Sequence, residues 1–463
     1  MTFGWVAEVV GGELHCADAR QEVGAVVIDS RVLQPHDFLV ALRGARYDGH
    51  EFVEQAFDKG AGGAMVERRS VASVEGVAKG RDLIAVDDTT KALQDLARAV
   101  RRASGTRVVA ITGSAGKTTT KEAVAELLAG RCRVVRNKGN LNNQIGLPLS
   151  LLQLRDRPDV AVMELGMNHA GEVSTLVGIA EPETRVWTNV GDAHIGFFAS
   201  ADALADAKAE ILERAAPSHL LVSNADDPLV SARVGHFVGR TVTFGTTREA
   251  TVRAVDIEGL GVEGMRARVL TPSGERPFHT PLIGRGNLLN VLAAMAVAQD
   301  FGCTLDEMVA AAGRLRPADR RGTVVRLREG VVMVDDSYNS SPAALASALD
   351  VVVNTRASRK VAVVGEMLEL GEHSLALHRQ AGRTAAAAQL QLLFVVGGPA
   401  AHALADSAVA AGMPAAAVRY LENSKLAGDE VVAAVRPGDL VLVKGSRGIR
   451  TDIVADRIAT VFA

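Results

Sequence analysis

Hydrophobic positions recur at two spacings along this chain, and stretches of the two kinds alternate. Short, largely apolar runs, such as residues 108–111, 160–165 and 186–190, are typical of buried strands. Between them, apolar residues stand three and four positions apart, which is the spacing of a helix with one buried face. Repeated alternation of this kind predicts an α/β protein with mostly parallel sheets and helices on both faces.

The alternating pattern forms three blocks, and a chain of 463 residues has room for two to four domains of ~100–200 residues. We predict a small N-terminal α/β domain over residues 1–104, a central doubly wound domain of the P-loop ATPase type over residues 105–317, and a C-terminal Rossmann-like domain over residues 318–463. The first boundary follows a predicted helix over residues 89–102. The last block has its own predicted strands, at residues 331–334, 361–364, 392–396 and 440–443.

A glycine turn after residues 108–111 carries the clearest chemistry. It ends at Lys117 and Thr118, which open a helical pattern. In such a loop, backbone N–H groups and the helix N-terminus hold phosphate oxygens, the lysine reaches the outer phosphates, and the hydroxyl can ligate magnesium. Ile111 stands where the general GxxxxGKS/T pattern has its first glycine, and an ordinary strand-to-helix turn is the alternative interpretation. The predicted phosphate-binding residues are Gly113, Ser114, Ala115, Gly116, Lys117, Thr118 and Thr119.

Two further candidates follow predicted strands of the central block, where ligand groups gather in a parallel sheet. Glu164 lies at the end of residues 160–165 and suits a hard divalent cation, which prefers oxygen ligands. His194 follows residues 186–190, but imidazole suits softer metals, and a lone histidine after a strand is more often structural.

Lys208 occupies an unexpected position in a helix predicted over residues 200–215, with Ser200 as its N-cap. It lies on the apolar stripe, four residues after Leu204 and three before Ile211. A buried ammonium is costly, so one interpretation is that the charge snorkels to water. The other is that the amine loses its proton and captures carbon dioxide as a carbamate, which would offer two oxygens to a metal.

Other polar clusters are as consistent with a structural role as with a role in ligand binding. Asn287 stands at the start of a helix predicted over residues 288–298, where it is either a helix cap or a recognition residue. Residues 29–31 and 48–50 are as consistent with turns as with a ligand site. Similar clusters follow the C-terminal strands, at residues 335–339, 365–371, 397–398 and 444–448.

Composition excludes several functional classes. Lys and Arg (51) nearly balance Asp and Glu (54), giving a formal net charge of −3, and aromatic residues make up 4%, so we expect no nucleic-acid partner. No uninterrupted apolar run of ~18 residues is present, so we expect no membrane span. Three widely spaced cysteines and the absence of a signal-peptide pattern favour the cytoplasm.

Eight segments, in order along the chain, resemble motifs of the Mur ligase family, which builds the peptide stem of the bacterial cell-wall precursor. They are TGSAGKTTTKE, NKGNLNNQIGLP, ELGMNHAGE, AKAEI, GRGNLLN, DDSYNSSP, GEMLELGEHS and KGSRG. The family relative that adds meso-diaminopimelate carries a DNPR motif, which is missing here, and this favours the dipeptide-adding branch. The resemblance implies a monomeric, ATP- and Mg²⁺-dependent ligase that joins D-alanyl-D-alanine to UDP-N-acetylmuramoyl-tripeptide through an acyl phosphate, for peptidoglycan synthesis.

The resemblance also implies roles for individual residues around the nucleotide. Lys117 would hold phosphates, and Lys208 would be carbamylated. The implied ligands of one magnesium are Thr118 and Glu164, and those of a second are His194 and the carbamate of Lys208. Asn287 would contact adenine, while Arg321 and Asp336 would contact the nucleotide from the C-terminal domain.

Substrate contacts are implied in all three predicted domains. The implied uridine-diphosphate pocket consists of Ser30, Arg31, Asp48, Gly49 and His50. The implied muropeptide contacts are Asn140, Asn142 and Asn143. The residues implied near the incoming dipeptide are Tyr338, Asn339, Lys444, Ser446 and Arg447.

Two departures from the family pattern stand in the C-terminal block. The family usually has NAN or NPD after the tyrosine, whereas this chain has Asn339-Ser340-Ser341-Pro342. The arginine before the third domain usually follows a glycine, but residues 319–322 are Asp-Arg-Arg-Gly, which leaves its register open by one position. The alternatives to the dipeptide-adding reaction are another ligase of the superfamily, such as a folylpolyglutamate enzyme, a nucleotide-switch scaffold, or a phosphotransferase.

Overall fold

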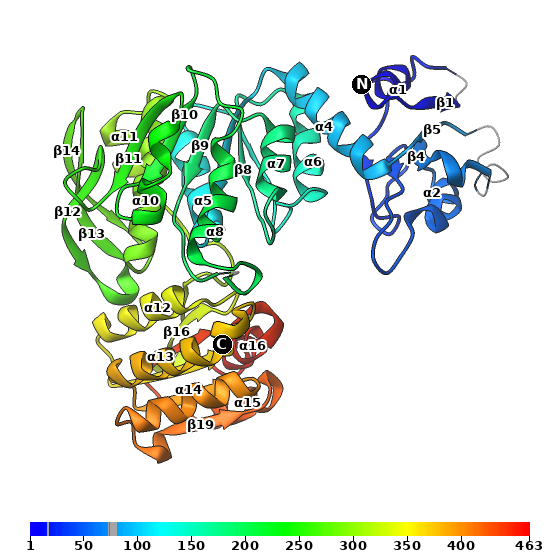
Figure 1. The fold of residues 1–463 in the computed structure, drawn as a ribbon. Coiled ribbons are helices and arrows are strands. Elements are labelled where there is room, and N and C mark those ends of the chain that lie inside the picture. Colours follow the sequence, from blue (N-terminus) through cyan, green and yellow to red (C-terminus); the bar gives the residue numbers. More distant parts are fainter. Residues whose placement is uncertain (16–17, 73, 75–80, 194) are drawn as a thin grey trace. The chain divides into compact units, whose positions relative to one another are not determined.

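The computed structural model describes residues 1–15, 18–72, 74, 81–193 and 195–463 (Figure 1). His194 therefore lies outside the described residues. The chain forms two compact units. Unit 1 consists of residues 1–110, 132–167 and 171–183, and unit 2 consists of residues 111–131, 168–170 and 184–463.

Unit 1 begins with a five-stranded sheet in the order β1-β5-β4-β3-β2. The strands from β5 to β2 are parallel, and β1 is antiparallel to β5. The apolar runs of the N-terminal block form these strands: β1 (Glu13–His15), β2 (Val26–Val27), β3 (Phe38–Val40), β4 (Gly63–Glu67) and β5 (Leu83–Val86). The helices are α1 (Phe3–Val10), α2 (Val53–Asp58) and α4 (Thr89–Ser104).

Helix α4 is bound tightly to the remainder of unit 1, which contains α6 (Gly146–Leu151), α7 (Glu172–Ala180), β7 (Val134–Arg136) and β8 (Val160–Glu164). Arg98 and Arg102 both pair with Glu181 just beyond α7, and these guanidinium groups hold the pKa of Glu181 at about 2. Arg101 donates to the carbonyl of Ala180 at 2.8 Å. The helix predicted over residues 89–102 is therefore an anchored part of this unit.

A nine-stranded sheet has the order β14-β13-β12-β11-β10-β9-β6-β8-β7, and its strand β6 (Arg107–Thr112) has residues in both units. In unit 2, the four strands from β9 to β12 are parallel, in keeping with the mostly parallel sheet that was predicted, although no strand was predicted at β11 or β12. The last two strands, β13 and β14, continue antiparallel at the edge, which the prediction missed. The bounds are β9 (Thr184–Trp187), β10 (Leu220–Asn224), β11 (Arg240–Gly245), β12 (Val252–Gly259), β13 (Met265–Thr271) and β14 (Gly274–Thr280).

Helices pack on this part of the sheet, and α10 packs on α5. Their bounds are α5 (Lys117–Leu128), α8 (Ala201–Ala209), α9 (Pro228–Ser231), α10 (Arg285–Asp300) and α11 (Leu305–Ala312). Within the part of the chain that the structure describes, no helix combines the length and apolar character needed to cross a membrane.

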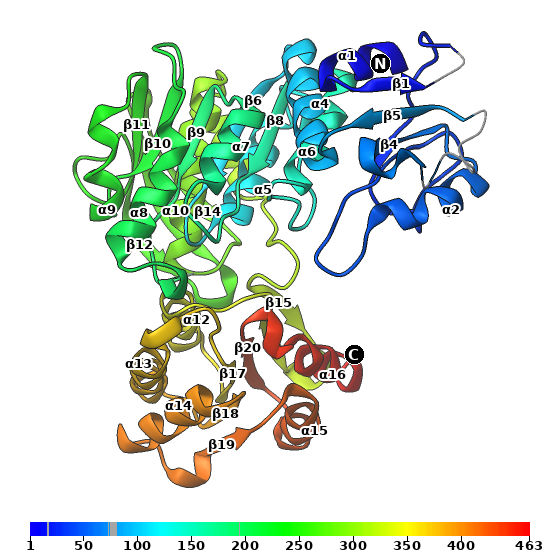
Figure 2. The same cartoon turned by 45° about the vertical axis from the view of Figure 1, so that its right-hand side comes forward.

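The C-terminal part of unit 2, the C-terminal module, is a six-stranded sheet in the order β15-β16-β20-β17-β18-β19, with only β15 antiparallel to its neighbour. Figure 2 shows α12, α13 and α14 on one face and α15 and α16 on the other. The strands are β15 (Thr323–Arg326), β16 (Val332–Asp336), β17 (Arg359–Gly365), β18 (Leu392–Val396), β19 (Val418–Leu421) and β20 (Asp439–Lys444). The helices are α12 (Pro342–Asn354), α13 (Ser374–Ala387), α14 (Pro399–Ala410), α15 (Ser424–Ala434) and α16 (Asp452–Val461). This two-faced parallel sheet confirms the Rossmann-like prediction.

Candidate active site

The glycine turn between β6 and α5 has the backbone that a phosphate loop requires. Gly113 and Gly116 have φ angles of +147° and +81°, which favour glycine. A Cβ at Gly113 would lie 1.9 Å from the Thr188 hydroxyl, and a Cβ at Gly116 would lie 2.2 Å from Oδ1 of Asn290. Lys117 Nζ donates to the Gly113 carbonyl at 2.7 Å, so its ammonium lies over the loop. Both positions therefore require glycine, because neighbouring side chains leave no room for a Cβ and because the backbone has a positive φ angle.

The segment after β9 fixes the conformation of this loop. The Ser114 hydroxyl donates to the Gly191 carbonyl at 3.1 Å and accepts from the Gly191 N–H at 2.9 Å. Asn189 Oδ1 accepts from the Ala115 N–H at 2.9 Å, and the Thr188 hydroxyl donates to the Ala115 carbonyl at 2.7 Å. Thr188 and Asn189 were not predicted, because their role depends on two loops that are distant in the chain.

Lys208 is buried, with 1% of its surface exposed. Burial lowers the pKa of its amine well below the usual 10.5, and the charge of Lys117 lowers it further. The snorkelling interpretation is wrong, because the side chain does not reach water. Ser200 caps α8 as predicted, accepting from the Ala203 N–H at 3.1 Å, but the helix ends at Ala209 and a 3-10 turn, Glu210–Leu212, follows.

Asn287 lies inside the first turn of α10, and Gly284 occupies the N-cap. The suggestion that Asn287 caps the helix is therefore wrong: its Nδ2 donates to the Ile283 carbonyl at 2.9 Å, and its Oδ1 accepts from Nδ2 of Asn290 at 3.2 Å. Asn290 in turn accepts from the Thr120 hydroxyl on α5 at 3.2 Å. This chain of bonds connects Asn287 to the helix that follows the phosphate loop.

In unit 1, Glu164 ends β8 and is 4% exposed. Its Oε1 accepts from Asn142 Nδ2 at 2.9 Å. Asn137, which was not predicted, makes two hydrogen bonds with the backbone of Glu164: its Oδ1 accepts from the Glu164 N–H, and its Nδ2 donates to the Glu164 carbonyl. Asn143 Oδ1 accepts from the Gly146 N–H at 2.8 Å at the start of α6. Asn140 is exposed, and its carbonyl accepts from the Asn142 N–H at 2.8 Å. The asparagine-rich segment thus positions Glu164.

The two clusters predicted in the N-terminal block form ordered turns. His50 Nε2 accepts from the Glu67 N–H at 2.9 Å, so its Nδ1 donates to Asp48 at 2.6 Å. Gly49 is required here, since a Cβ would lie 2.7 Å from the backbone nitrogen of Leu42. The Ser30 hydroxyl donates to Oε1 of Gln55 at 2.9 Å, and the exposed Arg31 pairs with Asp29 at 2.7 Å. The uridine-diphosphate pocket stays a prediction, as does its residue set.

In the C-terminal module, β16 and β20 bring Asp336 and Lys444 into register. Lys444 Nζ donates to Asp336 Oδ2 at 2.6 Å and to the Asn339 carbonyl at 3.0 Å. The Ser446 hydroxyl accepts from the Leu368 N–H at 2.9 Å. These residues therefore form one cluster where the parallel strands end.

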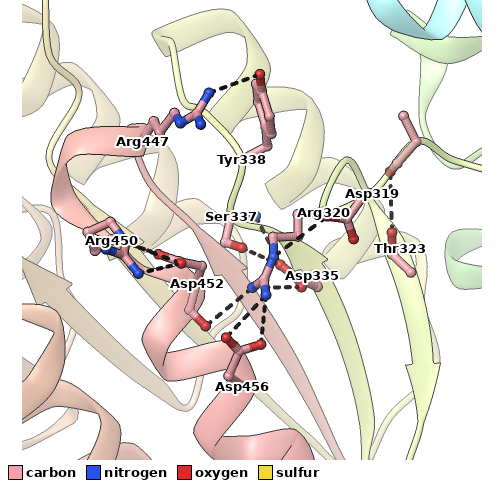
Figure 3. A network of polar contacts seen from close by, with 11 residues as sticks. Asp319, Arg320, Thr323, Asp335, Ser337, Tyr338, Arg447, Arg450, Asp452 and Asp456 are labelled. Atoms are coloured by element: carbon pink, nitrogen blue, oxygen red, sulfur yellow. Dashed lines mark hydrogen bonds and ion pairs between the residues drawn. The ribbon is translucent and has the colours of Figure 1, made fainter. Parts of the chain in front are cut away.

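Tyr338 lies close to two guanidinium groups, and Figure 3 shows that of Arg447 beside the tyrosine hydroxyl. The guanidinium carbon of Arg321 is 3.9 Å from the ring centroid, and that of Arg447 is 5.4 Å away. Arg447 Nη1 also donates to the tyrosine hydroxyl at 3.4 Å. Arg320, by contrast, lies among carboxylates, so the two adjacent arginines have different surroundings.

The described residues contain no group of three or more His, Cys, Asp or Glu side chains that could hold a metal. Mg²⁺ does not need such a group, because it is commonly held by one or two carboxylates together with substrate phosphates and water. Glu164 and the hydroxyl of Thr118 have the oxygen chemistry that it prefers. The residues present are therefore compatible with magnesium bound alongside a nucleotide.

Three family models match successive parts of the chain. They are the Mur ligase family catalytic domain over residues 22–101, the Mur ligase middle domain over residues 111–298, and the Mur ligase glutamate ligase domain over residues 320–447. The chain belongs to the Mur ligase family of ATP-dependent ligases, and its three-domain α/β architecture is as predicted. The domain boundaries at residues 104 and 317 stay predictions.

Within that family, the chain is similar to ligases named for the addition of D-alanyl-D-alanine. UDP-N-acetylmuramoyl-tripeptide--D-alanyl-D-alanine ligase of Bacillus subtilis (strain 168) is 32% identical over 457 residues, covering 98% of this chain and 97% of the relative. A crystal structure of MurF from Acinetobacter baumannii has a TM-score of 0.88 at 28% identity, covering 99% of this chain and 98% of that one. MurF ligase from Thermotoga maritima, solved in complex with ADP, has a TM-score of 0.83 at 28% identity, covering 95% and 97%.

Proposed function

We propose that this protein joins D-alanyl-D-alanine to UDP-N-acetylmuramoyl-tripeptide, with cleavage of ATP to ADP and phosphate. The observation that carries the proposal is a phosphate loop and a buried lysine of lowered pKa in a chain that matches dipeptide-adding ligases over 98% of its length. The cytoplasm is the proposed compartment and a monomer the proposed state.

The first step activates an inert carboxylate. The terminal carboxylate of the tripeptide attacks the γ-phosphorus of ATP, the bond to the β–γ bridging oxygen breaks, and an acyl phosphate and ADP form. Because two anions must meet, positive charge has to be concentrated there. Lys117 and the N–H groups of residues 113–119 supply it in this proposal.

The second step forms the amide. The neutral amine of D-alanyl-D-alanine, whose usual pKa is ~8, attacks the acyl carbon, and phosphate leaves the tetrahedral intermediate. Tyr338, Asn339, Lys444, Ser446 and Arg447 are the proposed residues around the dipeptide. Asn287, Arg321 and Asp336 are the proposed contacts that orient the nucleotide for the first step.

Magnesium is the proposed cofactor, and when bound it neutralises phosphate charge and stabilises the transferring phosphoryl group. Its proposed ligands are Thr118 and Glu164, with His194 and Lys208 as a carbamate on a second ion. The lowered pKa of Lys208 supports the carbamate, because only the neutral amine can attack carbon dioxide.

Mass spectrometry of one incubation tests the proposal. The purified protein is mixed with ATP, Mg²⁺, the UDP-linked tripeptide and D-alanyl-D-alanine, and we expect the muropeptide to gain one dipeptide less one water. Parallel incubations with L-alanyl-L-alanine and with single amino acids test the rival ligases. ADP release that needs no amine would contradict the proposal in favour of a nucleotide switch, and a stable phosphorylated product would favour a phosphotransferase. Tripeptides ending in lysine or in meso-diaminopimelate, supplied together, show which one this protein prefers.

A further inference from the structure

The turn at residues 318–322, between the central part of unit 2 and its C-terminal module, has an unusual backbone. Arg320 has a φ angle of +55°, in the left-handed region that residues with a side chain rarely adopt. Gly322, two residues later, has a φ angle of +73°. A non-glycine residue persists in such a conformation when its surroundings fix it in place.

The Arg320 side chain makes contacts that can fix this turn, all within the C-terminal module (Figure 3). Its Nη2 donates to both carboxylate oxygens of Asp456 on α16, at 2.8 and 3.1 Å. Its Nη1 lies 3.7 Å from Oδ2 of Asp335 at the end of β16 and donates to the Asp452 carbonyl at 3.3 Å. The guanidinium therefore joins the turn to both a strand and a helix, with its side chain 26% exposed.

Asp335 is held in an orientation that suits this pairing. It is 8% exposed, and burial raises the pKa of its carboxyl group while the charge of Arg320 opposes that shift. The hydroxyl and the N–H of Ser337 both donate to Oδ1 of Asp335, at 2.5 and 3.1 Å. Oδ2, the other oxygen, is the one that faces Arg320.

A backbone bond extends the effect of this anchor to the aromatic ring described above. The Tyr338 N–H donates to the Arg320 carbonyl at 3.1 Å. The next residue, Arg321, places its guanidinium carbon 3.9 Å from the centroid of the Tyr338 ring. Any shift of the turn would therefore move Arg321 and loosen Tyr338 together.

We propose that Arg320 is a positioning residue: its ion pairs with Asp335 and Asp456 hold the left-handed turn on the C-terminal module and thereby place Arg321 against Tyr338. The two arginines that the sequence left interchangeable thus have separate roles. The claim that Arg320 affects nucleotide binding rests on the proposed function, in which Arg321 contacts the nucleotide. The claim that Arg320 fixes the turn does not depend on the proposed function.

The central test compares Arg320→Ala with Arg450→Ala. Arg450 is a matched control, because it also has a left-handed φ angle, +63°, and also pairs with α16, through Asp452 at 2.9 Å. For Arg320→Ala we expect the KM for ATP to rise about tenfold, with kcat at saturating ATP within about threefold of wild type. Arg450→Ala should keep the wild-type KM for ATP. Arg320→Lys keeps the positive charge, so its KM for ATP should rise less than that of Arg320→Ala. The rescue should be only partial, because an ammonium lacks the planar fork that can serve two carboxylates.

Arg320→Gly separates the ion pairs from the backbone conformation, since glycine adopts the left-handed region freely. We expect this variant to resemble Arg320→Ala, and we expect the effects of Arg320→Ala and Asp456→Asn to be less than additive. Wild-type behaviour of Arg320→Gly would overturn the proposal. Equal increases in the KM of every substrate would also overturn it, by showing a general loss of structure.

Hydrogen exchange provides a readout that does not depend on catalysis. Arg320→Gly should speed exchange of peptides covering residues 318–323 and 337–339, whereas Arg450→Ala should not. Unchanged exchange would overturn the positioning role. If the wild-type protein forms no amide, the proposed function fails, yet the exchange experiment still decides whether Arg320 fixes the turn.

Discussion

Two lysines in unit 2 are equally buried but differ in their electrostatic surroundings. Lys208 on α8 and Lys444 on β20 are 1% and 2% exposed. Burial and the charge of Lys117 both disfavour the ammonium form of Lys208, whose pKa is lowered well below 10.5. Lys444, in contrast, lies 2.6 Å from the carboxylate of Asp336 and 3.0 Å from the Asn339 carbonyl.

This difference shows that the surroundings of a buried lysine indicate its role better than burial does. Lys444 is compensated within the protein, where its ammonium holds Asp336 and the loop after β16 in place. Lys208 lies near another cation, and such a site favours either a neutral amine or an arriving anion. The phosphate-loop region is thus arranged for chemistry with charges supplied by substrates, whereas the C-terminal cluster is arranged for precise geometry.

The largest effect should come from Lys117, which we expect to act on the phosphates directly. Lys117→Met removes the ammonium that offsets the charge of two reacting anions, so kcat should fall by about 10³-fold or more. Steady-state release of phosphate, measured with all three substrates, checks this. Lys91→Met is the control, because Lys91 is an exposed lysine on α4 and its loss should leave the rate unchanged. A normal rate of amide formation by Lys117→Met would show that catalysis does not need this ammonium, and the phosphate-loop region would then not differ from the C-terminal cluster in the way described.

The next largest effect should follow the loss of Lys208. Without a carbamate, Lys208→Ala should lose about 10²-fold in kcat, since a preorganised charged group of this kind contributes on that scale. Added formate or acetate should restore part of the activity by supplying carboxylate oxygens in the space left by the side chain. Lys208→Arg keeps a cation but cannot form a carbamate, so it should stay inactive. Full activity of Lys208→Ala without added carboxylate would end the carbamate proposal.

The same two regions show what the sequence could and could not predict. The apolar stripe placed Lys208 inside the protein, and the glycine turn identified the phosphate loop, because both depend on local spacing. Thr188 and Asn189 could not be predicted, since they act on the loop from a distant segment. The suggestion that Asn287 caps α10 was wrong for a local reason: Gly284 takes the N-cap position, and Asn287 already lies within the helix.

In the C-terminal module, the sequence predicted the parallel strands and the polar clusters at their ends. It did not predict which arginine would face Tyr338, because that depends on the left-handed backbone of Arg320 and on carboxylates from β16 and α16. The antiparallel strands β13 and β14 were missed because neither has a continuous apolar run: burial alternates along β13, and β14 begins with four exposed residues.

Stability should change in opposite directions when each buried lysine becomes methionine. Lys444→Met leaves Asp336 without its partner, so the free energy of unfolding should fall by about 2 kcal/mol. Lys208→Met replaces a group that is costly to bury by an apolar one of similar length, so the free energy of unfolding should rise, by about 2 kcal/mol at neutral pH. Urea denaturation in magnesium-free buffer measures both changes. A fall for both variants would mean that the two sites are electrostatically alike.

The smallest effect is the pH dependence of that stabilisation, and it isolates the charge of Lys208. The folded-state pKa of Lys208 is lowered from 10.5, so between the two pKa values the unfolded chain binds more protons than the folded one. The contribution of Lys208 to the free energy of unfolding of the wild type therefore rises with pH in that window, by at most about 1.4 kcal/mol per pH unit. Lys208→Met lacks this contribution, so its advantage over wild type should shrink from pH 7 to pH 9. Urea denaturation at pH 7, 8 and 9, in buffers freed of carbon dioxide, measures the difference. Parallel curves would mean that the amine of Lys208 keeps its proton in the folded protein, and the contrast with Lys444 would then disappear.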